Sequence, residues 1–264
     1  MYDFDFVTPA SLAEAAAALE DPEAMALGGG QTLIPTLRAR LAMPSKLVSL
    51  AGLAEIRGIC EDDDGRLCIG GATTHGAIAR DAAERFSGLA GLAQRIGDPA
   101  VRNRGTLGGS VANNDPAACY PAAILATGAT VVTHRREIAA GDFFQGMFTT
   151  ALDEGEIVTE VRFPVPRRSA YQKFEQPASR FALVGVFVAE MADGAVGVGV
   201  TGAAEEGGFR WEAAEAALAA RFDPAALEGL SHPAEGLISD IHGDAAYRAH
   251  LIGVMTRRAV AAAA

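Results

Sequence analysis

Lysine is almost absent from this sequence. Only Lys46 and Lys173 occur among the 264 residues, and 33 acidic residues stand against 22 basic ones. The formal net charge is therefore −11, and the isoelectric point calculated from the sequence is about 4.9. No run of basic residues interrupts this acidic balance. An acidic surface repels phosphate backbones and anionic lipids, so nucleic acid and membrane surfaces are excluded as expected partners.

Cysteine is also scarce, and its spacing carries no recognisable pattern. Cys60, Cys68 and Cys119 show no short paired spacing. An iron–sulfur cluster needs four thiolates, and a zinc site needs a grouping of Cys and His that this sequence lacks. The five histidines are scattered, and no Gly-x-Ser-x-Gly motif occurs. The sequence therefore predicts no metal site, no disulfide framework and no catalytic side chain of its own.

Long apolar segments are missing as well. No run of 18 apolar residues exists, and the first eleven residues lack the charged and apolar regions of a signal peptide. We therefore expect no membrane span and a cytoplasmic protein. Aromatic residues make up 6% of the chain, while half of all residues are hydrophobic. This composition is typical of a globular protein whose core relies on Ala, Val, Leu and Ile.

The distribution of helix, strand and turn residues predicts an α+β protein made of three units. We place these units at 1–53, 54–166 and 167–264. The last boundary follows from Pro164 and Pro166, because two closely spaced prolines break any regular element.

Local signals then place the elements within these units. Thr8 followed by Pro9 favours a helix start, 25–27 favours a short buried strand, and 33–41 favours a helix. The acidic run 61–64 before a glycine predicts a solvated hairpin turn, with calcium binding as the alternative. Further helices are expected from 73, within 81–96, and over 117–127, 211–220 and 244–263, with strands over 46–50, 129–133, 137–140, 156–163, 170–175, 182–191 and 196–202.

Two glycine-rich loops stand out from this framework. The first runs from Gly28 to Thr32, and the second from Gly105 to Ser110. Each combines closely spaced backbone N–H groups, glycines that admit a ligand to the main chain, and a hydroxyl, which is what a phosphate requires. We hypothesise that the loops hold one pyrophosphate from opposite sides. Neither matches the Walker or the Rossmann pattern, and tight turns without a ligand are the alternative.

Four stretches of the sequence, in order and almost end to end, resemble a known family. They are GGGQTLIPTLRARLAMPSKLVSL, IGGATTHGAIA, IGDPAVRNRGTLGGSVANNDPAACYPAAILATGA and HGDAAYRAHLIGVMTRRAV. Together they resemble the FAD-binding medium subunit of molybdenum hydroxylases of the carbon monoxide dehydrogenase and xanthine dehydrogenase type. The resemblance implies a PCMH-type FAD-binding fold of two subdomains followed by a C-terminal α+β domain.

The same resemblance implies a function and partners. A molybdopterin-containing large subunit would oxidise the substrate, and a small subunit would carry two [2Fe–2S] clusters. This chain would pass electrons from those clusters through FAD to an external acceptor, in a complex that is usually a dimer of heterotrimers. A stand-alone FAD-dependent oxidase or reductase of the same fold, and a scaffold without redox function, are the alternatives.

The resemblance also assigns cofactor-binding residues. Cys119 stands where many members have an aspartate near the flavin, so it either packs against FAD or fills the core. Phe181 matches a position that is often tyrosine against the isoalloxazine ring. The residues assigned to FAD are Gly28, Gly29, Gly30, Gln31, Thr32, Thr106, Leu107, Gly108, Gly109, Ser110, Asn113, Asn114, Cys119, Lys173 and Phe181.

Several of these side chains keep a second interpretation. Lys173 either lies near the pyrimidine end of the flavin or is a surface lysine of a strand. Arg102 and Arg104 pair either with phosphate or with surface carboxylates. Asp115, which precedes a proline, is either close to the cofactor or the N-cap of the next helix.

Overall fold

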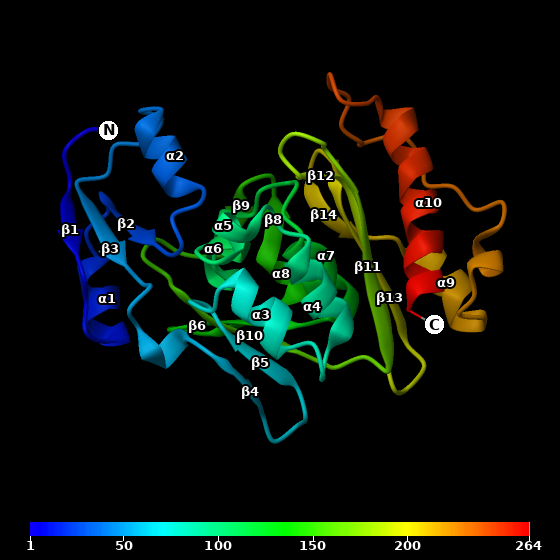
Figure 1. The fold of residues 1–264 in the computed structure, drawn as a ribbon, viewed down its shortest axis with the longest axis horizontal. Helices are drawn as coiled ribbons and strands as arrows, with labels where there is room; N and C mark the ends of the chain where they lie inside the picture. The colour runs from blue at the N-terminus through cyan, green and yellow to red at the C-terminus, as the bar shows by residue number, and fades with distance from the viewer. Residues whose placement is uncertain (264) are drawn as a thin grey trace.

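Three main sheets follow one another along the chain in the computed structural model, which describes residues 1–263 (Figure 1). The first sheet lies at one end of the molecule, the third at the other end, and the second between them. β10 (Val158–Phe163) of the second sheet ends just before β11 (Arg168–Glu175) of the third, so the proline-containing segment joins these two sheets. The expected α+β architecture is confirmed.

The first sheet is small and parallel, with the order β1-β3-β2. Its strands are β1 (Asp5–Val7), β2 (Ala24–Leu27) and β3 (Lys46–Ser49), connected through α1 (Leu12–Ala18) and α2 (Leu33–Arg38).

Two local predictions for this unit are wrong. The first helix begins later than Thr8 and Pro9 suggested, because Ser11 is its N-cap and accepts a hydrogen bond from Glu14 N at 3.2 Å. The strand β2 is not buried, since it lies at the edge of the sheet, and Met25 is 38% exposed.

The second sheet is antiparallel, with the order β4-β5-β10-β6-β7. One of its faces is covered by a helical layer, and the apolar residues of β5 and β10 pack against that layer in the largest core cluster. The remaining strands are β4 (Ile59–Glu61), β5 (Leu67–Gly70), β6 (Thr130–Thr133) and β7 (Glu137–Ala139), and the helices are α3 (His75–Asp81), α4 (Ser87–Gln94), α6 (Leu107–Asn113) and α7 (Tyr120–Thr127).

The third sheet is an antiparallel meander with the order β11-β12-β13-β14. It is formed by β11, β12 (Ala182–Glu190), β13 (Val196–Ala204) and β14 (Gly207–Arg210), and is followed by α9 (Glu212–Ala220) and α10 (Ala245–Ala262). Figure 1 shows α10 lying along one face of this sheet. The other face packs against α7, and the contact is close: a Cβ on Gly199 would lie 1.9 Å from Ala122 O. The alternation of Val and Gly in β13 therefore fits a sheet that is buried on both faces.

Short elements complete the chain. They are η1 (Ala54–Ile56), α5 (Pro99–Arg102), α8 (Ala140–Phe143), β8 (Phe144–Gly146), β9 (Thr149–Thr150) and η2 (Pro224–Leu227).

No helix between residues 1 and 263 combines the length and the apolar character needed to cross a membrane.

Candidate functional site

The structure brings the two glycine loops into direct contact. A Cβ on Gly29 would lie only 1.9 Å from the carbonyl oxygen of Arg104, and a Cβ on Gly28 would lie 2.8 Å from Thr106 Oγ1. Such distances are far shorter than real carbon–oxygen contacts, so only glycine fits at these two positions. The loops therefore form one continuous backbone surface between the first and second sheets.

The first loop connects β2 to α2 and leaves a run of amides unused. The backbone N–H groups from Gly28 to Thr32 donate no hydrogen bond to any other residue of the described chain. The carbonyl groups of Gly30 and Thr32, in contrast, accept from Ile34 N and Thr36 N at 3.2 Å each. Because a backbone N–H group needs a partner, several unpaired amides in succession indicate a site for an anion or for ordered water.

The second loop uses its amides inside the protein. Leu107 N donates to Thr73 O at 3.0 Å, and Gly108 N donates to Gly71 O at 2.8 Å. The side chain of Thr106 caps α6 by accepting from Gly109 N at 3.3 Å. The second loop therefore offers fewer free amides than the first, and the hypothesis that the two loops hold one pyrophosphate from opposite sides stays a prediction. Thr106 N is the amide at the start of α6 that keeps no partner within residues 1–263.

Two glycines of the second loop allow close packing within the second unit. A Cβ on Gly105 would lie 2.7 Å from His75 Nε2, and one on Gly108 would lie 2.9 Å from Gly71 O. His75 N also donates to Gly105 O at 2.9 Å, so His75 lies directly beneath the loop. Burial lowers the pKa of His75 to about 4, with the positive charge of Arg102 as a smaller cause. The imidazole is therefore neutral at neutral pH, and its Nδ1 lies 3.1 Å from the hydroxyl of Tyr120.

The two arginines before the second loop have different surroundings. Arg102 Nη1 donates to the carbonyl groups of Ile96 and Gly97 at 3.1 and 2.9 Å, and Arg102 forms no ion pair with a carboxylate of residues 1–263. Arg104 is exposed, and its side chain has no hydrogen bond or ion pair with residues 1–263. The main chain of Arg104 contacts Gly29, so this arginine is a cation whose backbone lies beside the first loop.

Asn114 ends α6 and contacts the hairpin of β8 and β9. It adopts a left-handed conformation with φ 43°, and its Nδ2 donates to Gly146 O and Thr149 O at 2.8 and 2.9 Å. Its Oδ1 is buried and has no hydrogen-bond partner in the described chain. Asn113 is half-buried at the end of the same helix. The unpaired Oδ1 is an acceptor that a hydroxyl group of a ligand would satisfy.

Asp115 forms a turn and does not cap a helix. Its Oδ1 accepts from Ala117 N at 2.8 Å, and its carbonyl oxygen accepts from Ala118 N at the same distance. The helix α7 consequently begins at Tyr120, three residues later than expected, and the predicted N-cap role of Asp115 is wrong.

Lys173 is buried, so its interpretation as a surface lysine is wrong. The residue is 5% exposed on β11, and its Nζ donates to Arg95 O at 2.6 Å and to Arg180 O at 2.8 Å. The thiol of Cys119, also 5% exposed, lies 3.8 Å from the same nitrogen. No carboxylate of residues 1–263 forms an ion pair with Lys173. The Cys119 position thus leaves a buried cation without a compensating carboxylate.

Arg95 and Tyr171 belong to the same environment but were not singled out from the sequence. Arg95, after α4, donates to Lys173 O at 2.8 Å and to Glu175 Oε1 at 3.0 Å, which ties α4 to β11. The hydroxyl of Tyr171 is buried without a hydrogen-bond partner among the described residues, and burial raises its pKa well above the ordinary value. No sequence signal marks Arg95, since its role depends on contacts between distant segments, whereas Tyr171 stands two residues before Lys173 in a segment, 171–174, that resembles the family.

Phe181 lies on the surface, with 58% of the residue exposed. It ends a tight loop between β11 and β12 in which Gln176 N donates to Phe181 O at 2.9 Å and Arg180 has a φ of 60°. Lys173 contacts this loop through Arg180 O. A buried lysine therefore fixes the loop that presents the exposed phenyl ring.

These features fit the diphosphate and ribityl groups of FAD. The first loop supplies unpaired donors for an anion, Arg104 supplies a nearby cation, and Asn114 supplies an unpaired acceptor. Fourteen residues of the sequence prediction lie in the two loops, in α6, or in the cluster around Lys173, whereas Phe181 lies on the adjoining loop.

Comparison with known proteins gives a consistent result. Residues 2–166 match the family model described as the FAD binding domain in molybdopterin dehydrogenase. The carbon monoxide dehydrogenase medium chain of Afipia carboxidovorans is 34% identical over 275 residues, which cover 97% of this chain and 95% of the relative. The nicotine 6-hydroxylase medium subunit of Paenarthrobacter nicotinovorans is 32% identical over 270 residues, with 97% and 95% covered.

Solved structures show the same relationship. A chain of reconstituted CO dehydrogenase from Oligotropha carboxidovorans superposes with a TM-score of 0.86 at 33% identity, covering 99% of this chain and 98% of that one. A chain of quinoline 2-oxidoreductase from Pseudomonas putida 86 superposes with a TM-score of 0.83 at 30% identity, covering 99% and 97%.

Proposed function

This chain belongs to the family of FAD-binding medium subunits of molybdenum hydroxylases, and we propose that its two glycine loops hold the diphosphate of FAD in such a complex. The chain is thus an FAD-binding oxidoreductase subunit with the PCMH-type fold. The observation that carries the site proposal is the run of unpaired amides from Gly28 to Thr32, held against the second loop.

The protein's own residues bind and orient the cofactor. We assign the diphosphate oxygens to the amides of the first loop and to Thr106 N, with Arg104 as the balancing cation. Asn114 Oδ1 would accept a hydrogen bond from a hydroxyl of the ribityl chain. FAD, when bound, supplies the redox chemistry that transfers electrons from partner [2Fe–2S] clusters to an external acceptor. No side chain of this chain acts as nucleophile or general base.

The environment of Lys173 and Cys119 is proposed to adjoin the flavin ring. A buried ammonium group with no carboxylate partner favours negative charge nearby, so it favours the reduced form of the cofactor. Phe181 offers an apolar ring on the neighbouring loop. This proposal keeps Lys173 and Cys119 in the cofactor site, where Cys119 serves as a packing residue.

Partners follow from the names of the relatives. They are medium chains or medium subunits, so we propose a large subunit with a molybdopterin centre and a small subunit with two [2Fe–2S] clusters, in a dimer of heterotrimers. The units 1–53, 54–166 and 167–264 each contain one of the three main sheets, which supports the proposed division into two FAD-binding subdomains and a C-terminal domain. The cytoplasmic location stays a prediction.

The test is to purify the full chain alone and together with the proteins that accompany it in its native cell. We expect flavin absorbance at one FAD per chain in both preparations, with substrate oxidation only in the preparation that contains molybdenum and iron. Robust turnover of NADH or small organic substrates by the chain alone would favour the stand-alone oxidase or reductase. A colourless chain that takes up no added FAD would favour the scaffold.

A further inference from the structure

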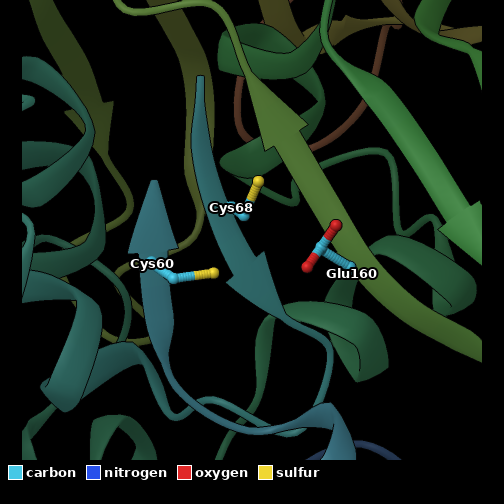
Figure 2. A group of neighbouring side chains, drawn as sticks. All are labelled: Cys60, Cys68 and Glu160. Carbon is cyan, nitrogen blue, oxygen red and sulfur yellow. The ribbon is translucent and has the colours of Figure 1, made fainter. Parts of the chain in front are cut away.

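Two cysteines and a glutamate meet on the second sheet, on the face opposite its helical layer. Cys60 on β4 lies directly across from Cys68 on β5, and Glu160 on β10 lies across from Gly70 of β5. Figure 2 shows the three side chains on these three neighbouring strands. The two sulfur atoms and a carboxylate oxygen all lie within 4.8 Å of one another.

The register of the strands explains why these side chains share a face. Leu67 and Ile69 of β5 belong to the core beneath the helices. Since successive side chains of a strand alternate between faces, Cys68 faces the other side, as does Cys60 opposite it. The two cysteines are eight residues apart in the sequence, a spacing that predicts nothing by itself. They lie opposite each other because the acidic hairpin turn between them reverses the chain.

The donor set has a clear chemical preference. Two thiolates with one carboxylate suit Zn²⁺ and similar soft or borderline divalent ions, whereas Ca²⁺ and Mg²⁺ require oxygen ligands only. Zn–S and Zn–O bonds of about 2.3 and 2.0–2.2 Å put ligand atoms on a tetrahedral ion about 3.5–3.8 Å apart. The ligand atoms therefore need to approach one another by at most about 1.3 Å, which small side-chain rotations allow.

Two of the three donors can be reached from solvent, because Cys60 is exposed and Glu160 is half-buried, whereas Cys68 is 3% exposed. The group lines a cavity of about 390 Å³ together with the acidic residues 62–64, Arg66 and Arg162. Arg162 Nε donates to Glu160 Oε1 at 2.6 Å, and its Nη1 donates to Glu137 Oε1 at the same distance, so its charge is shared between two carboxylates. Glu160 Oε2 has no partner among residues 1–263 and remains available as a ligand.

The neighbouring Asp62 is not available as a ligand. Its Oδ1 accepts from Arg66 N at 2.9 Å and from Asp64 N at 3.1 Å, and its Oδ2 accepts from Arg66 Nε at 2.7 Å. These bonds order the turn that the sequence identified as a solvated turn or a calcium loop, and they leave no carboxylate oxygen of Asp62 free of partners. The fourth position on a bound ion would therefore be taken by water from the cavity.

We propose that Cys60, Cys68 and Glu160 form a binding site for one Zn²⁺ or a similar thiophilic divalent cation, with water as the fourth ligand. The ion joins β4, β5 and β10. The chain continues from β5 into Gly71 and Thr73, whose carbonyl groups hold the second glycine loop. Metal binding therefore stabilises the sheet on which that loop rests.

The test uses the full-length chain, reduced, freed of metal, and titrated with Zn²⁺ and with Cd²⁺. Calorimetry is expected to give one ion per chain, and Cd²⁺ is expected to produce the ultraviolet charge-transfer band of a metal–thiolate bond. Because Cys60 is exposed, Cys60→Ala folds normally and is expected to weaken binding by more than about 100-fold. Glu160→Gln is expected to weaken it about 10-fold.

The matched control is Asp63→Asn, which removes an exposed acidic group from the same cavity. Asp63 forms no ion pair with residues 1–263, so its loss is expected to leave the affinity unchanged. Equal losses in Asp63→Asn and Glu160→Gln would show diffuse attraction to an acidic surface and overturn the proposal. Unchanged binding in Cys60→Ala would overturn it as well, as would isolation of the chain with a Cys60–Cys68 disulfide in place of metal. Thermal unfolding of each variant, measured in parallel with the metal titrations, checks that the fold is retained.

Discussion

The first glycine loop, Gly28–Thr32, and the second, Gly105–Ser110, lie against each other but use their backbone amides differently. The amides of the first have no partner among residues 1–263, while the second donates through Leu107 and Gly108 to the segment after β5. The same composition therefore accompanies two arrangements: the second loop is attached to the protein through its amides, and the first loop is the one for which we propose ligand binding. A glycine tract in a sequence indicates a close approach to the main chain. Only the contacts in the structure show whether the approaching group belongs to the protein or leaves room for a ligand.

Breaking the contact between the loops is expected to have the largest effect. Gly29→Ala puts a Cβ 1.9 Å from Arg104 O, so the loops have to separate. We expect a loss of FAD affinity on the order of 100-fold, which corresponds to about 2.8 kcal/mol and is measured by quenching of flavin fluorescence. Gly52→Ala is the control, because nothing lies within 4 Å of its Cβ. FAD binding by Gly29→Ala at wild-type affinity would contradict the assignment of the site.

Acid is expected to weaken the support of the second loop. The folded-state pKa of His75 is about 4, below the ordinary 6.5, so its contribution to stability is present above pH 6.5 and is lost as the pH falls towards 4. The full loss amounts to about 3 kcal/mol. Urea unfolding between pH 7 and 4 should show a steeper decline for the wild type than for His75→Gln. Parallel pH profiles of the two proteins would argue against this role.

A substitution in the second loop is expected to lower the stability of the protein more than its affinity for FAD. Gly108→Ala puts a Cβ 2.9 Å from Gly71 O, and overpacking of this kind costs about 1–3 kcal/mol. Chemical denaturation measures this loss. Gly91→Ala on α4, where nothing lies within 4 Å, is the matched control and should be neutral or slightly stabilising. A Gly108→Ala protein of undiminished stability that has lost FAD would assign this glycine to the ligand instead.

The smallest effect is expected at the cation beside the first loop. Arg104→Ala removes one exposed charge from the site, and a charge-assisted hydrogen bond at the lower end of its range corresponds to about a 10-fold loss in FAD affinity. The free energy of unfolding should not change, because the side chain has no protein partner within residues 1–263. Arg258→Ala, at an exposed position of α10, makes the same change in net charge far along the chain. Similar losses in both variants would indicate a general effect of charge.

Much of the architecture could be predicted from the sequence, because local signals dominate there. The proline-containing segment between β10 and β11, the hairpins, the cap at Asp244 and both glycine loops depend on residues that are close in the chain. The wrong predictions have two causes. The later starts of α1 and α7 result from competition between neighbouring polar groups, and the burial of Lys173 results from distant carbonyl groups.

The sequence by itself determined the α+β class, the family and the two loops, since backbone freedom and turn chemistry are properties of short segments. Tertiary structure alone decided which loop keeps free amides, and it brought Cys60 and Cys68 to the same position on a sheet. Hydrogen-bond partners and strand register are set by segments far apart in the chain, so neither can be read from local spacing.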